Sequence, residues 1–268
     1  MPYDPTSIPL LDAKHHDAPS VFKPESLLRE ARRQKRLPQI PVPEICILDP
    51  DGDLVRNLRG EGRASPRPGW ACYHSELDQF DHAGIRFGVI GCAVGASFAV
   101  LLAEELFASG CRLLLSITSA GEILASGPTP YFVVIDRALR DEGTSYHYLP
   151  PARFVDADRG LTDLAYAALV GGRIAAHRGA TWTTDAPFRE TEFAIEAARE
   201  NGILAVEMEA AALYAFARAR GAQVLCLAFV TNQMAQSEGD FEKGESNGAA
   251  AVLAAIAVIA RAWRAAHP

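Results

Sequence analysis

The sequence has few cysteines and no long apolar run. Its five cysteines are scattered, odd in number and without a Cys-x-x-Cys pair, which argues against a disulfide framework and a zinc site. The seven histidines show no metal-ligand spacing beyond one adjacent pair, and we expect no metal. The longest apolar run, residues 249–260, has 12 residues, whereas a membrane span needs about 20. We therefore expect a soluble protein.

Positive charge is also in short supply. The chain has 26 Lys and Arg against 33 Asp and Glu, a net charge of −7, and neither half is basic. This balance argues against binding by phosphate neutralisation, so we expect no nucleic-acid partner and no membrane partner. The first residues lack the basic and apolar regions of a signal peptide. With the unpaired cysteines, this favours a cytoplasmic location.

Proline is concentrated in residues 1–43, which carry eight of the 17 prolines. Within them, a helix is expected over residues 24–36, ending in the basic run LLREARRQKR. We interpret this segment as an arm that wraps the domain or a neighbouring subunit. A basic arm that binds an anionic partner is the alternative. Residues 44–268 are then expected to form a single domain.

From residue 44 onward, short apolar runs typical of buried strands alternate with helical patterns. The predicted strands cover residues 44–48, 85–90, 113–117, 131–135, 180–183, 203–206 and 224–230. The predicted helices cover residues 97–107, 161–177, 190–200, 208–220 and 246–263. This alternation predicts an α/β domain of three layers, α/β/α, with a mixed central sheet. Ligands of such sheets bind beyond the carboxyl ends of the strands, so the loops after each strand are the candidate sites.

Two carboxylates follow the strand at residues 203–206. Glu207 and Glu209 flank Met208 at the start of a predicted helix. One interpretation is structural, because acidic residues in a first helical turn complement the helix dipole. The other is functional. A carboxylate accepts two hydrogen bonds from a vicinal diol such as that of ribose, and a methionine offers a soft apolar surface beside it.

The segment VEMEAAALYAFARARGAQVLCLAFVTNQ resembles the signature of the nucleoside phosphorylase family that includes uridine phosphorylase and hexameric purine nucleoside phosphorylase. The resemblance extends through AEELFASGCRLLLSITSAGEI, DEGTSYHYLPP and TWTTDAPFRET, covers about residues 85–265, and is much weaker before residue 85. It implies a nucleoside phosphorylase-like fold and a pentosyltransferase. Such an enzyme cleaves the N-glycosidic bond of a ribonucleoside through an oxocarbenium-like state. It implies no cofactor, inorganic phosphate as co-substrate, and a homo-oligomer built from dimers, up to a hexamer.

The same resemblance implies roles for individual residues. The ribose-binding residues would be Glu207, Met208 and Glu209. The base-binding residues would be Phe188, Arg189, Gln233, Tyr146 and His147. The residues near phosphate or another acceptor would be Ser116, Ser119, Arg67 and Gly95. The residues that assist departure of the base would be Asp185 and Asn232.

The expected phosphate site departs from the family pattern. Relatives carry a Gly-Asp-Pro-x-Arg turn after the first strand, whereas here the turn reads DPDGDL and Leu54 stands in place of the arginine. Ser116 replaces a second arginine, and the glycine-rich loop is reduced to CAVGAS. Arg67, with a one-residue shift, or Arg56 are the candidate replacements.

If the pocket lacks phosphate cations, water is the alternative acceptor. In that case Asp49, Asp51 or Glu122 would orient it.

The base end departs as well. Purine-specific relatives carry an aspartate after the strand at residues 224–230, where this chain has Asn232, which cannot act as an acid. Asn232 and Gln233 suit the carbonyl and imide edge of a pyrimidine, or they cap a loop. Asp185 is another candidate acid, although an aspartate before Ala-Pro is also an ordinary turn former.

Three functions stay open at this point. The first is a phosphorylase with a rearranged anion site, with a uridine or other pyrimidine substrate slightly favoured. The second is a hydrolytic nucleosidase on the same fold. The third is a non-catalytic protein that binds nucleosides. Dependence on phosphate separates the first two, and ribose binding without turnover would indicate the third.

Overall fold

The computed structural model describes residues 8–12, 14–232 and 243–267. The α-helices are α1 (Pro24–Lys35), α2 (Asp53–Gly60), α3 (Ala96–Ala108), α4 (Arg159–Gly171), α5 (Glu192–Glu200), α6 (Ala210–Arg220) and α7 (Ala249–Ala266). The strands are β1 (Ile45–Asp49), β2 (Ser65–Pro66), β3 (Asp78–His82), β4 (Ile85–Gly91), β5 (Leu113–Glu122), β6 (Tyr131–Asp141), β7 (Phe154–Asp156), β8 (Ala176–Thr184), β9 (Ile203–Glu207) and β10 (Val224–Asn232). Short 3-10 helices are η1 (Thr144–His147), η2 (Pro187–Arg189) and η3 (Glu245–Gly248).

All ten strands belong to one mixed sheet that closes on itself along part of its length. Strands β2, β3, β4, β1 and β5 lie side by side, and β5 continues through β10, β6 and β8 to β9. Strand β9 then pairs antiparallel with the end of β5, at Gly121 and Glu122. Five strands therefore form a closed barrel, and an open extension carries β1 to β4.

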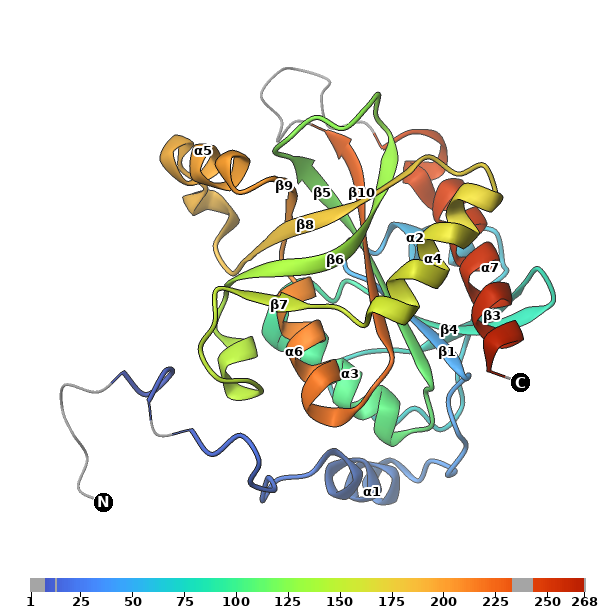
Figure 1. Ribbon diagram of the computed structural model, residues 1–268. Coiled ribbons are helices and arrows are strands. Elements are labelled where there is room, and N and C mark those ends of the chain that lie inside the picture. Colours follow the sequence, from blue (N-terminus) through green and yellow to red (C-terminus); the bar gives the residue numbers. More distant parts are fainter. Residues whose placement is uncertain (1–7, 13, 233–242, 268) are drawn as a thin grey trace.

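Helices cover both faces of the sheet, which confirms the predicted three-layer α/β/α class (Figure 1). Helices α3 and α6 pack on one face, and α2, α4 and α7 pack on the other. Strand β1 is apolar from Ile45 to Leu48 because both of its faces are buried. Cys46 and Leu48 belong to the core under α3 and α6, whereas Ile45 and Ile47 belong to the core under α7.

The final helix is long and apolar because it is a core element. The stretch Glu245–Ala266 has 22 residues and contains an 18-residue window with a mean hydropathy of 1.6, so by length and composition alone it is long and apolar enough to cross a membrane. In the structure, α7 packs against α4, and Ile256, Ile259 and Trp263 are fully buried in the domain. Its apolar character is therefore explained by packing.

The N-terminal arm contacts the domain through α1. Leu28 and Ala31 are buried against Ala71, and Arg32 donates a hydrogen bond to Ser109 Oγ at 3.3 Å. The division of the chain at residues 43 and 44 stays a prediction, because the arm and the domain share this packing.

The structure extends some predicted elements and shortens others. Residues 118–121, expected as a loop, belong to β5 and pair with β10 and β9. The helix expected over residues 161–177 ends at Gly171, where Gly172 N–H closes the last turn on Ala168 O. Helix α2 and strands β2, β3 and β7 were not predicted, because they are short and lie among turn-forming residues.

Candidate active site

A cleft of about 400 Å³ lies beyond the carboxyl ends of β1, β5, β9 and β10. Its lining residues come from the last residues of β5, β9 and β10, from the turns after β1, β4 and β9, and from η2 and the residue after it: Pro50, Asp51, Val94, Thr118, Ser119, Ala120, Gly121, Pro187, Phe188, Glu190, Val206, Glu207, Met208, Glu209 and Asn232. The cleft therefore brings together Phe188, Ser119, Asn232 and the Glu207–Glu209 segment.

Glu207 is buried and all its hydrogen bonds point into the protein. Its Oε1 accepts from the hydroxyls of Thr181 and Thr183, and its Oε2 accepts from the N–H groups of Glu209 and Ala210 at 2.7 Å each. Burial raises its pKa, and these donors oppose the shift. Since the two N–H groups open α6, Glu207 caps this helix and fixes the position of Glu209.

Glu209 has one oxygen held by the protein and one without a partner. Its Oε1 accepts from Gly95 N–H at 2.8 Å, whereas its buried Oε2 has no hydrogen-bond partner among the residues that the structure describes. Burial, followed by the Glu207 charge, raises the pKa of Glu209 to about 8. A buried acceptor that lines a cleft and lacks a partner is a binding atom for a ligand that donates hydrogen bonds.

Apolar side chains form another part of the cleft. Met208 follows β9, and Pro187 and Phe188 belong to η2. The Phe188 ring is 98% exposed. An exposed aromatic ring at the edge of a cleft is suited to stack on a planar ligand.

The turn after β1 places a carboxylate on the backbone of β5. Asp51 Oδ2 accepts from Ser119 N–H at 2.8 Å. Asp49 Oδ2 accepts from Val55 N–H at 2.9 Å, and burial, with the nearby charges of Asp51 and Asp53, raises the pKa of Asp49 to about 6. The N–H of Ser119 is therefore already bound to an acidic side chain.

The basic side chains near this turn are paired with acceptors that belong to the turn and to the start of α2. Arg56 donates to Asp51 O and to Asp53 Oδ1, each at 2.7 Å. Lys243, a residue that sequence reasoning missed, lies 2.7 Å from Asp53 Oδ2 and 3.5 Å from Asp51 Oδ2. Among the described residues that line the cleft, none is a lysine, an arginine or a histidine.

The expected phosphate residues are mostly engaged elsewhere. Arg67 donates to Gln79 Oε1 at 2.9 Å and to Pro41 O, outside the cleft. Ser116 is buried in the middle of β5, between β1 and β10. Leu54 is buried in the core beneath the turn. Of the predicted acceptor residues, Ser119 lines the cleft, and Gly95 binds Glu209 through its N–H.

Several predicted base and catalytic residues also lie outside the cleft. Asp185 accepts from Gly143 N–H at 2.9 Å, which ties the end of β8 to the loop before η1. The Tyr146 hydroxyl donates to Arg140 O at 3.0 Å, and His147 Nδ1 lies 3.1 Å from Lys14 Nζ in the N-terminal arm.

Three other candidates need separate mention. Arg189 is exposed and does not line the cleft. Gln233 lies outside the described residues. Glu122 is buried beside β9 and accepts from the Tyr131 hydroxyl at 2.8 Å, so it does not face the cleft.

Glu190 is a cleft residue that sequence reasoning missed. It lines the cleft directly after η2, and burial raises its pKa. The sequence placed it at the start of the helix expected over residues 190–200, whereas α5 begins at Glu192. The sequence signal that could have identified Glu190 is its position two residues after Phe188, a predicted base-binding residue.

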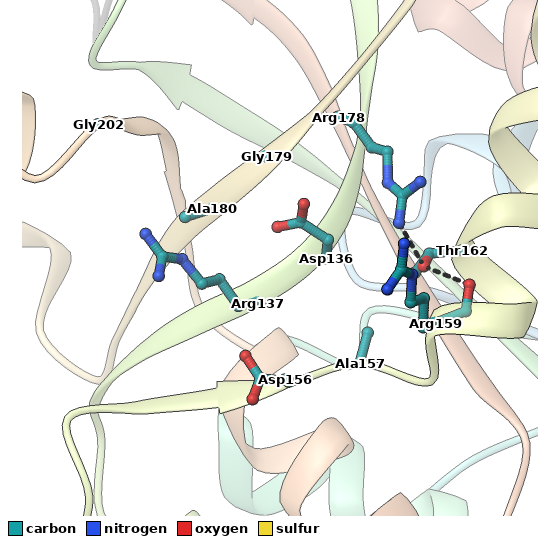
Figure 2. A pocket seen from close by; sticks show the side chains of 10 residues that line it. All are labelled: Asp136, Arg137, Asp156, Ala157, Arg159, Thr162, Arg178, Gly179, Ala180 and Gly202. Atoms are coloured by element: carbon teal, nitrogen blue, oxygen red, sulfur yellow. Dashed lines mark hydrogen bonds between the residues drawn. The ribbon is translucent and has the colours of Figure 1, made fainter.

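A second cleft, of about 500 Å³, lies between β6, β7, β8 and the start of α4. Its charged lining residues are Arg137, Arg159, Arg178, Asp136 and Asp156 (Figure 2). Positive and negative side chains are mixed there, and none of the predicted site residues lines it. These arginines are therefore not available to the cleft that contains Glu209.

Comparisons with known proteins agree with this fold. The model of the phosphorylase superfamily matches residues 44–264. A guanosine phosphorylase from Halorubrum lacusprofundi is 28% identical over 170 residues, which are 62% of this chain and 66% of the relative. A DeoD-type purine nucleoside phosphorylase from Jannaschia sp. is 28% identical over 157 residues, which are 58% of this chain and 67% of the relative. The match thus spans just under two thirds of the first relative.

A solved structure has the same fold. Uridine phosphorylase from Vibrio fischeri ES114, in complex with 6-hydroxy-1-naphthoic acid, superposes with a TM-score of 0.67 at 19% identity. The match covers 84% of this chain and 91% of that structure.

Proposed function

Because the chain belongs to the phosphorylase superfamily, we propose that it cleaves the N-glycosidic bond of a ribonucleoside and transfers the ribosyl group to phosphate. The phosphorylase names of the curated relatives and of the similar structure support this assignment. The sequence favours a pyrimidine base, whereas both curated relatives are named for purine substrates. The sequence and the relatives therefore point to different bases, and the substrate panel described below has to include both purine and pyrimidine ribonucleosides.

The free oxygen of Glu209 carries the proposal. Within the described part of the chain, Glu209 Oε2 is buried and has no hydrogen-bond partner, while Oε1 accepts from Gly95 N–H. Two adjacent hydroxyls, as on C2′ and C3′ of ribose, donate to this oxygen in the ionised carboxylate, and the two donated hydrogen bonds favour that form over the protonated form that the unliganded protein holds at pH 7. Met208 beside it offers an apolar surface for the sugar ring.

The charge of the cleft suits the reaction. Asp51, Glu190, Glu207 and Glu209 line one cleft. As the bond between C1′ and the base breaks, positive charge develops on the sugar. Fixed carboxylates stabilise that charge more than they stabilise the neutral nucleoside. The protein's contribution is then to orient the sugar and stabilise the oxocarbenium-like state.

Product analysis tests the proposal. Purified protein is incubated with a panel of ribonucleosides, with and without phosphate, and free base and sugar products are separated by chromatography. We expect ribose 1-phosphate and free base when phosphate is present. If every ribonucleoside binds and none is cleaved, the protein is a nucleoside-binding protein and the proposed activity is wrong.

Hydrolysis is a second candidate, favoured by the acidic side chain at the expected anion site. Asp51 already accepts from Ser119 N–H, and no described lining residue is basic. A phosphate dianion in this cleft would meet four acidic side chains and no described basic lining residue, while Lys243 beside the cleft is already paired with Asp51 and Asp53. Water carries no charge and meets no such repulsion. In hydrolysis, the bond between C1′ and the base breaks and its electron pair leaves with the base, the oxygen of water bonds to C1′, and the proton of water passes to Asp51 and from there to the departing base, so that the products are ribose and free base.

Asp51→Asn separates the two candidates. Asparagine retains an acceptor for Ser119 N–H but removes the negative charge and the basic group. If phosphate is the acceptor, the variant binds phosphate more tightly and its KM for phosphate falls. If water is the acceptor, ribose release falls at every phosphate concentration. Asp81→Asn, a change at an exposed aspartate outside the cleft, is the control.

The homo-oligomer, the cytoplasmic location and the absence of a cofactor remain predictions. Among the described residues, no group of three or more His, Cys, Asp or Glu side chains is placed to hold a metal.

A further inference from the structure

We propose that a cleft between the N-terminal arm and the domain binds an anion that carries two or more phosphate groups. The cleft has a volume of about 910 Å³, and it lies between residues 14–19 of the arm, residues 148–150 and the end of α6. We call it the arm cleft. The arm lies outside residues 44–264, which match the phosphorylase superfamily. The inference therefore goes beyond the proposed ribonucleoside function and does not depend on it.

Two contacts hold the arm beside η1. His16 Nε2 lies 3.1 Å from Tyr146 O, and Lys14 Nζ lies 3.1 Å from His147 Nδ1. Since an ammonium group has no acceptor, Lys14 donates to a ring nitrogen of His147 that carries no proton. These contacts place ionisable side chains of the arm in the same cleft as Arg218, which lies in the last turn of α6.

The arm cleft holds more positive charge than negative. Its charged and ionisable lining residues are Lys14, His15, His16, Asp17, Arg218 and Arg220. Asp17 is the acidic member of this described set. Burial, followed by the charges of Lys14 and His16, lowers the pKa of His147 beside them. Because the whole chain has a net charge of −7, this surplus of positive charge is local, and it attracts an anion to the arm cleft.

Two of the cations are available to a ligand. Among the residues that the structure describes, the exposed Arg218 side chain has no hydrogen-bond or ion-pair partner, and Lys14 contacts His147 but no carboxylate. Arg220 differs, because its Nε and Nη2 donate to Glu104 Oε1 at 3.1 and 3.0 Å. Glu104 therefore neutralises Arg220, whereas Arg218 and Lys14 can pair with an anion.

The origin of these cations indicates the class of ligand. Lys14 and His15 belong to the arm, whereas Arg218 belongs to α6. A chain of phosphate groups can pair with cations of both elements at once, whereas a single phosphate group offers one small centre of charge. The volume of the arm cleft falls within the range of about 300–1,000 Å³ that is usual for small-molecule sites. Inorganic polyphosphate and the phosphate chain of a nucleoside triphosphate share this chemistry.

Calorimetric titration of the full chain tests the inference. Tripolyphosphate, inorganic phosphate and adenosine triphosphate are titrated in magnesium-free buffer at constant ionic strength. The test variant, Arg218→Gln, removes the unpaired guanidinium group. The control, Arg173→Gln, removes the same charge at an exposed position between α4 and β8, outside the arm cleft.

Limited digestion with trypsin gives a second readout, which reports on the arm itself. Lys14 provides the one trypsin site before Arg29, because Lys23 precedes a proline and is not cleaved. An anion that pairs with both Lys14 and Arg218 holds the arm on the domain and hinders this cleavage. Release of residues 1–14 is followed by mass spectrometry, with and without tripolyphosphate.

We expect tripolyphosphate to bind wild type and Arg173→Gln at least about tenfold more tightly than inorganic phosphate does, and Arg218→Gln to lose about tenfold of this affinity. At ten times its Kd, tripolyphosphate should slow cleavage after Lys14 about tenfold in wild type, but not at that concentration in Arg218→Gln. Equal affinity for tripolyphosphate and phosphate, an affinity that persists in Arg218→Gln, or unhindered cleavage after Lys14 overturns the assignment.

Adenosine triphosphate distinguishes the two sources of the phosphate chain. If it binds at least about tenfold more tightly than tripolyphosphate and Arg218→Gln weakens its binding, the ligand is a nucleotide. If it binds equally or more weakly, the ligand is free polyphosphate. Tripolyphosphate that binds wild type and Arg218→Gln equally lies elsewhere, and the arm cleft is then refuted whether or not the protein cleaves ribonucleosides.

Discussion

Replacing Glu209 by glutamine should stabilise the protein while removing its ribose site. Burial and the Glu207 charge raise the pKa of Glu209 to about 8, against an ordinary value of 4.5. At pH 7 the unfolded chain holds this carboxyl ionised, whereas the folded protein holds it protonated. Folding therefore takes up a proton, and at about 1.4 kcal/mol per pH unit the cost at pH 7 is about 3 kcal/mol.

The sign of this cost sets its pH dependence. A carboxyl with a raised folded-state pKa costs almost nothing below pH 4.5, and its cost grows with pH until the pH is above 8, where the folded state is ionised as well. Glutamine carries no charge at any of these values, and its Oε1 still accepts from Gly95 N–H. We therefore expect Glu209→Gln to raise the free energy of unfolding by about 3 kcal/mol at pH 7, by about 4 kcal/mol at pH 8 and by little at pH 4.5.

Urea unfolding of wild type and Glu209→Gln at several pH values between 4.5 and 8.5 measures this difference directly. Glu192→Gln, which removes an exposed carboxylate, is the control and should show no such trend. If Glu209→Gln is equally or less stable than wild type at pH 8, or if its advantage does not grow with pH, the reasoning about the buried carboxylate is refuted.

Three further predictions concern the surroundings of the cleft. Thr183→Val removes a donor to Glu207 and the acceptor of Ala211 N–H, and should lower the free energy of unfolding in urea by about 1–3 kcal/mol. Asp49→Asn should raise the Tm at pH 8 but hardly at pH 4, because the pKa of Asp49 is raised from 3.8 to about 6 by burial and its ionisation costs stability as pH rises. Met208→Ala should raise the KM for a ribonucleoside about tenfold, as apolar contact with the sugar is lost, with the Tm as a check on folding.

The layers of the fold could be predicted because both faces of the central strands are buried. In β10, Leu225 and Leu227 belong to the core under α7, whereas Cys226 and Ala228 belong to the core under α3 and α6. Such strands read as continuous apolar runs, which are visible in a sequence. Their number and spacing between helical patterns were enough to indicate an α/β domain.

The closure of the barrel could not be predicted, because small residues carry it. Ser119, Ala120 and Gly121 have weak strand preference and resemble a loop, but they pair with β10 and β9. What favours the strand here is pairing with segments about a hundred residues away, and this overrides the local preference. The carboxyl ends of β5 and β9 are brought together by the same pairing, which forms the cleft.

The part of the candidate site whose residues are close together in the sequence could be predicted. The part that depends on how loops fold could not. Glu207 and Glu209 stand together in the sequence, so their chemistry was visible. Asp185 was chosen as a candidate acid, but as a turn former it binds Gly143 N–H instead. Glu190 was hidden at the start of a predicted helix, and only the path of η2 places it in the cleft.

The contribution of Glu209 to ribose recognition is tested most directly by one ratio. The value of kcat/KM is measured for a ribonucleoside and its 2′-deoxy counterpart, in wild type and in Glu209→Gln. We expect the wild type to prefer the ribonucleoside by at least about tenfold, through the 2′-hydroxyl bound to Glu209 Oε2, and Glu209→Gln to lose this preference. Equal use of both substrates by the wild type, or a preference that survives in Glu209→Gln, would contradict the account.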